Sequence, residues 1–503
     1  MKKTLNSIFD ICFLAVSLMI FAAAFSQMIL QSVAAGLLVI PLAFLFVYIC
    51  IKKTDVLEKI GCEKIWWVLR ILSFFLMMKF AFSLEVEFSW DWGRLINSSY
   101  NFITAHDIKN PYYYARYPNN QFWLLCMVSL FKIIKLFVGS ADILVFKHIT
   151  MAASVIILQI AIEFIYRTAK MIFSPKAALL TGILSVSCLP LYLYSEFLYT
   201  DTPSVLLISV MLFLYFKFLQ AENRKKQIAF CVLLGLVGAL TYFIKIMALI
   251  VFAAILIGVI FTKISFKRFL CFFLVCVTVF GVSVKAIKIV TEPIYKEKFG
   301  ITDELKEKYE FPPTHWIMMG LGYGGFSQDD VNYTAGFDTY QERKNATVAE
   351  IKRRCADYGF SGLVKHIFYN KVIRTFGNCT LAGSDYAGRR PIYKNGTFSR
   401  LLSEHGDLYP VSLIFLWIYY IFIMLGLLFS AIGSLGKKKS TANSKLLAGR
   451  IAIFGIFAFM LLWECNSRYI LVFVPVLILL ATDGLSYFVK TFNNYLNLKK
   501  ELR

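Results

Sequence analysis

Charged residues are scarce in this chain. Asp, Glu, Lys and Arg make up 17% of its 503 residues, whereas 58% are hydrophobic and the mean hydropathy is +0.66. Because soluble domains carry about 25% charged residues, this composition excludes an ordinary soluble domain. Long apolar stretches with few charges are typical of helices that cross a membrane. The sequence therefore predicts a polytopic membrane protein.

Signals of metal and nucleic-acid binding are also missing. None of the 11 cysteines stands in a C-x-x-C pair, and the 5 histidines lack a spacing such as H-E-x-x-H. We therefore expect no metal site and no cofactor. No soluble segment carries a basic face with interleaved aromatic residues, so nucleic acid is not an expected partner. Cys355 and Cys379 fall in a long hydrophilic region, where they either pair or remain free thiols.

Apolar runs divide most of the sequence. Most of them approach the roughly 20 residues that a spanning helix needs. Backbone groups in lipid must be bonded within their own segment, so these runs are expected to be helices. We predict an all-α polytopic fold with about 12–13 transmembrane helices and an external lobe of helical or mixed structure. The runs are 8–31, 32–51, 65–84, 121–138, 143–166, 176–196, 203–219, 226–243, 246–262, 269–289, 410–433, 448–466 and 469–489.

The basic residues predict which segments face inside. The net charge is +22, and inner loops of membrane proteins are enriched in Lys and Arg. The first run is expected to be an uncleaved anchor rather than a signal peptide. The segments 85–120, 195–202, 290–409 and 464–468 are then expected outside. The basic segments assigned to the inner side are 52–64, 167–176, 224–226, 263–268, 437–439 and 499–503.

This topology contains a conflict of parity. An odd number of crossings must separate the outer segment 85–120 from the inner segment 167–176, yet two apolar runs lie between them. One of the runs 121–138 and 143–166 is therefore expected to be a partial, broken or surface-lying helix.

Four regions follow from this order. Residues 1–64 are expected to form an N-terminal transmembrane hairpin with an inner loop, and residues 65–289 a membrane module whose outer loop, 85–120, contains short interfacial helices. Residues 290–409 should form a large external lobe. Residues 410–503 should form the C-terminal transmembrane helices and a basic inner tail.

Asp91 is the first candidate for chemistry. It stands between Trp90 and Trp92, just after the run 65–84 and at the start of the first sizeable outer segment. A carboxylate held against the outer membrane surface is suited to act as general base on a lipid-linked substrate. The alternative is a solvated aspartate in an outer loop.

Three further groups of polar residues are expected at the same face. They lie in the segment 194–203, in the segment 242–246 near the outer end of a helix, and in the segment 464–469. Acids and bases gathered at one membrane face suit transfer from a phosphate-linked lipid, because a carboxylate takes the acceptor proton while Lys and Arg stabilise the leaving phosphate. The residues expected to act on or bind the substrates are Asp91, Asp201, Lys245, Arg468, Arg116, Tyr117, Glu196 and Tyr199.

Plainer interpretations exist for the same residues. Asp201 is placed to cap the helix that follows it, and Lys245 to snorkel towards the membrane interface. Arg468 has a nearby partner in Glu464. The tyrosines of 112–117 suit an aromatic belt.

In these segments the sequence resembles polytopic glycosyltransferases of the GT-C type. This is the superfamily of protein O-mannosyltransferases and aminoarabinose transferases, and the likeness is greatest to bacterial members of the kind called glycosyltransferase family 39-like. The matches keep their order over roughly 80–490. They are Asp91, 114–120 (YARYPNN), 198–202 (LYTDT), 243–245 (FIK), 315–321 (HWIMMGL) with Gly324, Gly325, Asp329 and Asp330, and 467–469 (SRY).

The resemblance implies a sugar donor linked to a polyprenyl phosphate and an acceptor that is a cell-envelope glycan, lipid or protein. It implies an active site on the outer face of the plasma membrane, with membrane lipid as a further partner. Asp91 would be the general base of an inverting transfer and Asp201 a second acid. Lys245 and Arg468 would contact the donor phosphate. The alternative is a transporter or flippase of lipid-linked sugars, a class that usually holds ionisable residues near mid-membrane on broken helices.

Overall fold

The computed structural model describes the backbone of residues 2–52, 61–139, 142–262, 264–436 and 445–501. These residues form helices joined by short turns, and their one β-pairing is an isolated antiparallel bridge between Val86 and Pro391. The predicted all-α class is confirmed. Most of the basic inner segment 52–64 and all of 437–439 lie outside the described residues.

Apolar helices account for the predicted runs. Nine helices of the described chain are long and apolar enough to cross a membrane, and four more are apolar but shorter. The long helices are α1 (Lys2–Gln31), α4 (Cys62–Ser83), α7 (Gln121–Val138), α8 (Ile143–Ile172), α11 (Asp201–Gln220), α12 (Arg224–Ile244), α14 (Phe266–Pro293), α22 (Tyr409–Leu435) and α25 (Val474–Glu501). The shorter ones belong to α2 (Val33–Lys52), α9 (Pro175–Val186), α13 (Leu249–Ile260) and α24 (Leu447–Leu462).

The run 176–196 is not one helix, so that prediction is wrong. α9 ends at Val186, and the short α10 (Leu189–Leu193) follows after a turn. Pro190 lacks a backbone N–H and its ring obstructs the preceding turn of a continuous helix, which is why the chain bends there. All residues of 191–200 are buried. The break thus folds an expected outer loop into the protein interior.

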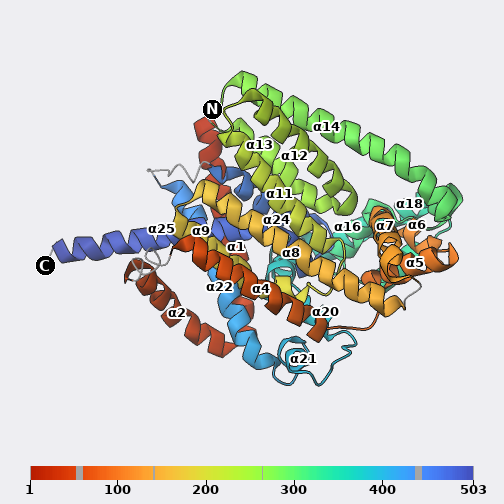
Figure 1. The fold of residues 1–503 in the computed structure, drawn as a ribbon, viewed down its shortest axis with the longest axis horizontal. Helices are drawn as coiled ribbons and strands as arrows, with labels where there is room; N and C mark the ends of the chain where they lie inside the picture. Colours follow the sequence, from red (N-terminus) through yellow and green to blue (C-terminus); the bar gives the residue numbers. More distant parts are fainter. Residues whose placement is uncertain (1, 53–60, 140–141, 263, 437–444, 502–503) are drawn as a thin grey trace.

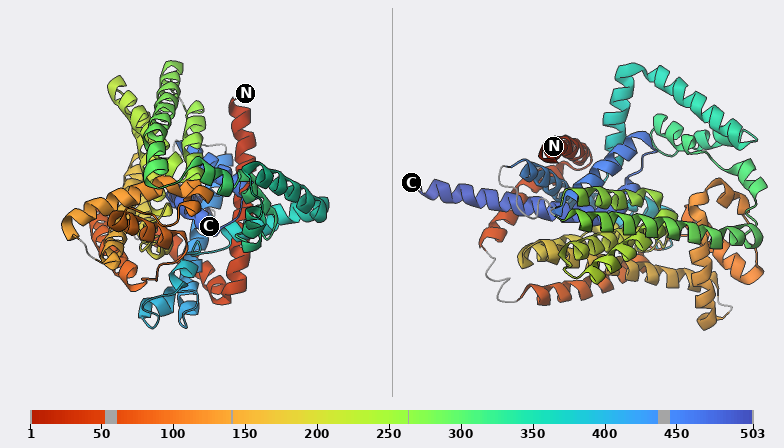
Figure 2. Two further views of the ribbon diagram at one scale, coloured as in Figure 1. Left: turned by 90° about the vertical axis from the view of Figure 1, so that its right-hand side faces the viewer. Right: turned by 90° about the horizontal axis from the view of Figure 1, so that it is seen from above.

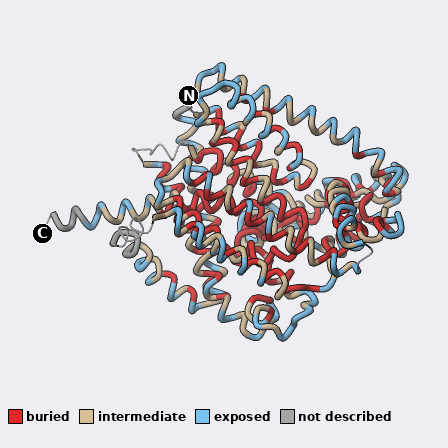
Figure 3. The backbone as a smooth tube through the Cα atoms, viewed as in Figure 1, coloured by how far each residue is buried: buried red, intermediate tan, exposed pale blue. Residues whose placement is uncertain are grey.

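The helix bundle has a closely packed centre and a periphery that exposes apolar side chains. α11 lies between α8 and α12, α22 runs along α25 and α1, and α13 packs on α24 (Figure 1). Buried residues concentrate in this centre (Figure 3). α14 packs mainly on α12 and leaves large apolar side chains exposed. Such a surface suits contact with lipid, which is as apolar as the side chains themselves.

α7 and α8, the two runs behind the conflict of parity, run in different directions. Both are long and apolar enough to span a membrane. Figure 1, however, shows α7 nearly end-on while α8 lies in the plane of the view. α7 packs against α12 and against α5 (Trp90–Ala105). That one of the two helices does not fully cross the membrane stays a prediction.

α5, α6 (Pro111–Arg116), α16 (Pro313–Leu321) and α18 (Tyr340–Lys365) come from two of the segments expected outside. They lie at the end of the molecule opposite the C-terminus, on the right in Figure 1 and in the right-hand view of Figure 2, whereas α21 (Thr397–Leu402) lies at the bottom of Figure 1. Segment 85–120 forms short helices as predicted: α5, α6 (Pro111–Arg116) and the 3₁₀ turn η1 (Pro118–Asn120). Leu95, Phe102 and Ile103 of α5 are buried. The apolar face of α5 therefore anchors the whole segment to the bundle.

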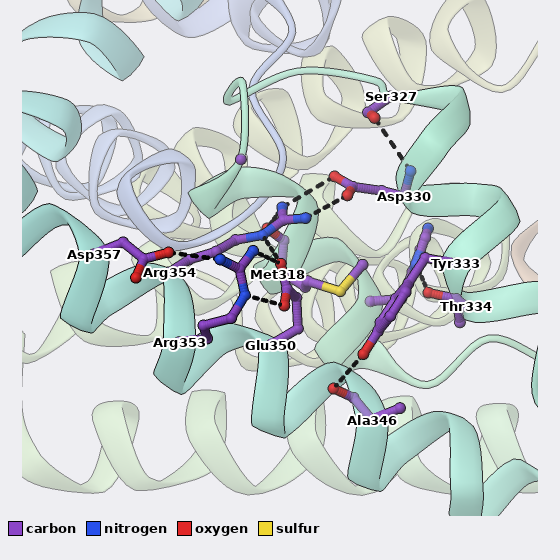
Figure 4. A network of polar contacts seen from close by, with 12 residues as sticks. Met318, Ser327, Asp330, Tyr333, Thr334, Ala346, Glu350, Arg353, Arg354 and Asp357 are labelled. Carbon is purple, nitrogen blue, oxygen red and sulfur yellow. Dashed lines mark hydrogen bonds and ion pairs between the residues drawn. The ribbon is translucent and has the colours of Figure 1, made fainter.

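The lobe expected to be external is built from helices, most of them short. They are α15 (Asp303–Tyr309), α16 (Pro313–Leu321), α17 (Gln328–Ala335), α18 (Tyr340–Lys365), the π-helical η4 (His366–Asn370), α19 (Lys371–Phe376), α20 (Gly383–Gly388) and α21 (Thr397–Leu402). Arg354 joins two of them, because its Nη2 lies 2.5 Å from Asp330 Oδ1 and its Nε lies 2.7 Å from Glu350 Oε1 (Figure 4). Arg353 adds contacts to Glu350 and Asp357. This network ties α17 to α18.

The later part of the lobe is attached to the membrane helices. α19 packs against α1, α24 and the 3₁₀ helix η5 (Ser467–Phe473). Cys355 is partly exposed and Cys379 is buried, and both are free thiols. Of the two alternatives for these cysteines, the structure has the unpaired one.

Candidate active site

Asp91 lies in the first turn of α5, where the partial positive charge of the helix N-terminus favours a carboxylate. Its Oδ1 accepts a hydrogen bond from the Tyr113 hydroxyl at 2.5 Å. Its Oδ2 lies 3.4 Å from the Tyr199 hydroxyl. Asp91 is half-buried, so it is a held carboxylate rather than a solvated one.

Asn120 completes this group. Its Nδ2 donates to the Tyr113 hydroxyl at 3.0 Å, and its Oδ1 accepts from the Tyr199 hydroxyl at 2.9 Å. Burial and the nearby carboxylate Asp91 raise the pKa of both tyrosines well above its ordinary value, so both hydroxyls remain donors. Tyr113 and Asn120 stand in the expected segment 112–120, but nothing in the sequence distinguishes them from their neighbours.

Asp201 and Lys245 form a buried ion pair beside this group. Lys245 Nζ lies 2.5 Å from Asp201 Oδ1, and the two side chains are 10% and 2% exposed. Lys245 follows the last residue of α12 and does not snorkel to the surface. Asp201 begins α11 without capping it, since α11 has no side-chain cap. Burial lowers the pKa of Lys245, and the adjacent Asp201 opposes that shift.

Arg468 is the second cation of the site. Its Nε lies 3.8 Å from Asp201 Oδ2, and its Nη1 donates to the Tyr386 hydroxyl at 2.9 Å. Four aromatic rings surround its guanidinium at 5.2–5.7 Å, an arrangement that stabilises a desolvated cation. The rings belong to Trp90, Tyr199, Tyr386 and Tyr469. Tyr386 comes from α20, and no sequence signal marked it.

Trp90 adopts a backbone conformation that side chains disfavour. Its φ is 41°, in the left-handed region. This turn directs the chain into α5 and sets the Trp90 ring 5.0 Å from that of Tyr199 and 4.8 Å from that of Tyr386. Strain of this kind persists where the surrounding structure imposes it, often at functional sites. Trp90, the neighbour of Asp91 in the sequence, thus also contacts Arg468 through its ring.

Glu464 is a third buried carboxyl group here. It is 4% exposed, and its Oε2 accepts a hydrogen bond from the Tyr469 hydroxyl at 3.2 Å. Burial raises its pKa to about 7, while Arg468 acts in the opposite direction. The ion-pair contact of Arg468 is with Asp201 rather than with Glu464.

Besides Trp90 Nε1, two polar atoms in the cluster are left without a hydrogen-bond partner. They are Asp201 Oδ2 and Arg468 Nε, which are buried and face each other across 3.8 Å. Buried polar groups normally have a partner. This pair is thus suited to exchange its mutual contact for a polar ligand.

Three of the expected residues lie elsewhere. Glu196 is buried in a second network, where its Oε2 accepts from the Val86 N–H at 3.2 Å. The Arg116 guanidinium lies 5.1 Å from the Phe311 ring, and the Tyr117 ring lies 5.8 Å from the same ring. Glu196 thus holds the residues before α5, whereas Arg116 and Tyr117 join the outer segment to the lobe.

Among the described residues, no group of three or more His, Cys, Asp or Glu side chains is placed to hold a metal ion. The side chains of the site are carboxyl groups, the Asn120 amide, two cations and aromatic rings. Such a set can bind an anionic group at its cations and accept a proton at a carboxylate.

A family model described as "Conserved hypothetical integral membrane protein" matches residues 1–487, and the chain belongs to this family. Together with the nine helices that could span a bilayer in the described part of the chain, this defines a multi-pass membrane protein. None of the curated proteins matches the sequence.

Two solved structures resemble the chain. One is the oligosaccharyltransferase of Archaeoglobus fulgidus tethered to an acceptor peptide that contains the NVT sequon, at 17% identity and a TM-score of 0.40. The match covers 85% of this chain and 50% of that one, so the chain spans about half the length of the oligosaccharyltransferase. The other is ArnT from Cupriavidus metallidurans bound to undecaprenyl phosphate, at 12% identity and a TM-score of 0.34. That match covers 83% of this chain and 78% of ArnT.

The likeness is too low to give any residue of this chain a role. The roles proposed below rest on the contacts within the site.

Proposed function

We propose that the chain is an integral membrane glycosyltransferase. It moves a sugar from a polyprenyl-phosphate donor to a cell-envelope glycan, lipid or protein at the outer face of the plasma membrane. The observation that supports this most is the single cluster in which Asp91, held by two tyrosines, lies near the cations Lys245 and Arg468. A carboxylate base beside two buried cations suits the displacement of a phosphate.

The cations receive the donor phosphate. Arg468 can offer two nitrogens to phosphate oxygens, while Lys245 acts as a compact point charge. Asp201 is the positioning residue of this half-site, since it contacts both cations. Arg468 Nε has no hydrogen-bond partner, and the donor phosphate supplies an acceptor for it.

Asp91 acts on the acceptor. Its carboxylate takes the proton of an acceptor hydroxyl, the oxygen attacks the anomeric carbon, and the bond from that carbon to the phosphate oxygen breaks. The electron pair leaves with the phosphate, whose charge the cations stabilise, and the configuration at carbon inverts in one step. General-base assistance contributes about 10²–10⁴-fold. Tyr199 bridges the two halves, because its hydroxyl faces Asp91 and its ring faces Arg468.

The other residues expected at the site, Arg116, Tyr117 and Glu196, suit supporting roles. Arg116 and Tyr117 lie where the outer segment meets the lobe, which suits an acceptor that approaches from the lobe side. Glu196 bonds the backbone just before α5 and acts through the position of Asp91.

A flippase of lipid-linked sugars is the second candidate. One observation favours it: the helices hold a buried charge cluster away from the main site, with Arg450 Nη2 3.5 Å from Asp483 Oδ2 and Nη1 3.9 Å from Asp10 Oδ1. Ionisable groups between membrane helices often mark transport pathways. The cluster joins α1, α24 and α25, so a purely structural role explains it as well.

The test measures release of polyprenyl phosphate from a panel of polyprenyl-phosphate sugars by purified protein, with candidate acceptors added. Wild type should turn over one donor, and Asp91→Asn should lose at least 100-fold in rate. Asp107→Asn is the matched control, because Asp107 lies in the same outer segment but is exposed. Full activity of Asp91→Asn would exclude this base. Absence of turnover with every donor and acceptor, together with flipping in liposomes, would favour the flippase.

A further inference from the structure

A cavity lined by basic side chains and tyrosines lies in the lobe, beside the loop that carries Glu464. Its volume is about 200 Å³, and His366, Lys371 and Arg374 line it together with Gly322 and Gly324. The cavity shares no lining residue with the Asp91 cluster. Its charged side chains are all basic.

Lys371 is a buried cation without a carboxylate partner. The side chain is 1% exposed, and its Nζ donates to the Trp463 carbonyl at 2.9 Å. No carboxylate of the described residues forms an ion pair with it or with Arg374. A buried charge is normally paired, because its desolvation is costly. Burial lowers the pKa of Lys371, while the nearby Cys465 and Glu464 act in the opposite direction.

The glycine-rich segment 320–325 forms the opposite wall. Arg374 Nη1 donates to the Tyr323 carbonyl at 2.7 Å, and its guanidinium stacks 3.9 Å from the Tyr323 ring. A Cβ at Gly325 would lie 2.7 Å from Arg374 Nε, so a side chain there would displace the guanidinium. Gly324 has a φ of 91°, which glycine adopts without strain. The glycines therefore let the backbone approach the basic side chains.

An exposed apolar stripe lies on the last part of α18 and on η4, the elements that also carry the cavity residues Tyr358, His366 and Asn370. Phe360, Val364 and Phe368 are 87%, 42% and 47% exposed, and their spacing of four places them on one helical face. Tyr323 lines the cavity and is exposed, and Tyr369 is exposed on η4. Figure 2 shows α18 and the helices after it projecting sideways from the bundle before the chain returns to it. Exposed aromatic side chains next to basic groups are typical of the membrane interface.

We propose that this cavity binds the phosphate headgroup of an anionic phospholipid, with the acyl chains lying along the stripe of Phe360, Val364 and Phe368. The unpaired cations Lys371 and Arg374 receive the phosphate oxygens. This proposal does not rest on the proposed transferase activity, because lipid binding is measured without turnover.

The same contacts connect the cavity to the Asp91 cluster. Lys371 bonds the Trp463 carbonyl, and the Cys465 N–H donates to the Gly324 carbonyl at 2.6 Å. Both bonds hold the loop that contains Glu464 and leads into Arg468. An occupied cavity would therefore stabilise this loop.

The experiment measures binding of single lipids to the full-length, delipidated protein in detergent, for example by native mass spectrometry. Phosphatidylglycerol is the probe, and phosphatidylcholine is the uncharged comparison lipid. Arg374→Gln should weaken phosphatidylglycerol binding at least tenfold, and Lys371→Met should do the same if it folds. Lys365→Met is the matched control, because Lys365 is exposed on α18 outside the cavity. The Lys365→Met variant should bind phosphatidylglycerol with the affinity of wild type.

Several outcomes would overturn the proposal. Equal phosphatidylglycerol affinity in wild type and Arg374→Gln is one, and equal affinity of wild type for both phospholipids is another. Saturation of the cavity by inorganic phosphate, without preference for a lipid, would assign it to a soluble anion. Polyprenyl phosphate binding that depends on Arg374 while phosphatidylglycerol binding does not would replace the phospholipid by the isoprenoid.

Discussion

The Tyr113 hydroxyl donates a hydrogen bond to Asp91 Oδ1 over 2.5 Å, and the two residues lie 22 positions apart in the sequence. The bond joins the first turn of α5 to α6. It fixes one oxygen of the carboxylate and leaves the other facing Tyr199. A base must hold its geometry as well as its charge, so Tyr113 is the residue through which the outer segment positions Asp91.

Tyr113→Phe should therefore reduce transferase activity without unfolding the protein. A hydrogen bond to a charged group contributes about 1.5–3 kcal/mol, which corresponds to roughly a 10- to 100-fold loss in rate. Initial rates of polyprenyl phosphate release measure the effect. Tyr112→Phe is the control, since Tyr112 is 42% exposed and lies outside this bond. An unchanged kcat in Tyr113→Phe would show that Asp91 needs no such support.

The Asp201–Lys245 pair should show strong coupling. Removal of one member leaves the other charge buried, which costs about 3–5 kcal/mol. Asp201→Asn and Lys245→Met should each lower Tm, while the double variant should lose less than the sum of the two. Thermal unfolding in detergent measures this cycle. Additive losses would mean that the two side chains act independently. All three variants should be inactive, because each removes a group from the phosphate half-site.

Glu464 should make stability depend on pH. Its folded-state pKa of about 7 exceeds the ordinary value of 4.5 because the group is buried. As pH rises from 4.5 to 7, the unfolded chain releases this proton before the folded chain does, so stability falls over that window. Glu464→Gln cannot ionise and should be more stable than wild type at pH 8, by roughly 1–3 kcal/mol.

The difference between Glu464→Gln and wild type should shrink as pH falls towards 5. Tm of both proteins at several pH values measures it. Glu87→Gln replaces an exposed carboxylate and serves as the control. A difference that stays constant with pH would indicate that Glu464 does not titrate in this range.

Gly484 should tolerate no side chain. A Cβ there would lie 1.8 Å from the Gly426 carbonyl oxygen, where α22 and α25 touch. Close approach of backbones through small residues is how membrane helices gain packing energy. Gly484→Ala should therefore lower Tm and the yield of folded protein sharply. Gly281→Ala is the matched control on exposed α14, where a Cβ meets nothing within 4 Å. Equal yields would contradict the contact.

The sequence by itself determined the class of the fold, an all-α polytopic membrane protein. Apolar runs must become helices in lipid because their backbone groups have no other partner, and a run such as 143–166 carries that information locally. Basic loops indicate orientation in the same local way. Asp91, Asp201, Lys245 and Arg468 were predictable as candidates, since a charged residue at the edge of an apolar run is conspicuous.

Only the tertiary structure decided how these candidates combine. Pro190 interrupts a run that hydropathy alone joins, and the bend buries residues 191–200, from which Tyr199 reaches Asp91. Tyr386 reaches Arg468 from the external lobe across 82 positions of sequence. Hydropathy reports the preference of each segment for lipid or water. It does not report which side chains of distant segments meet, because those contacts depend on how the helices pack.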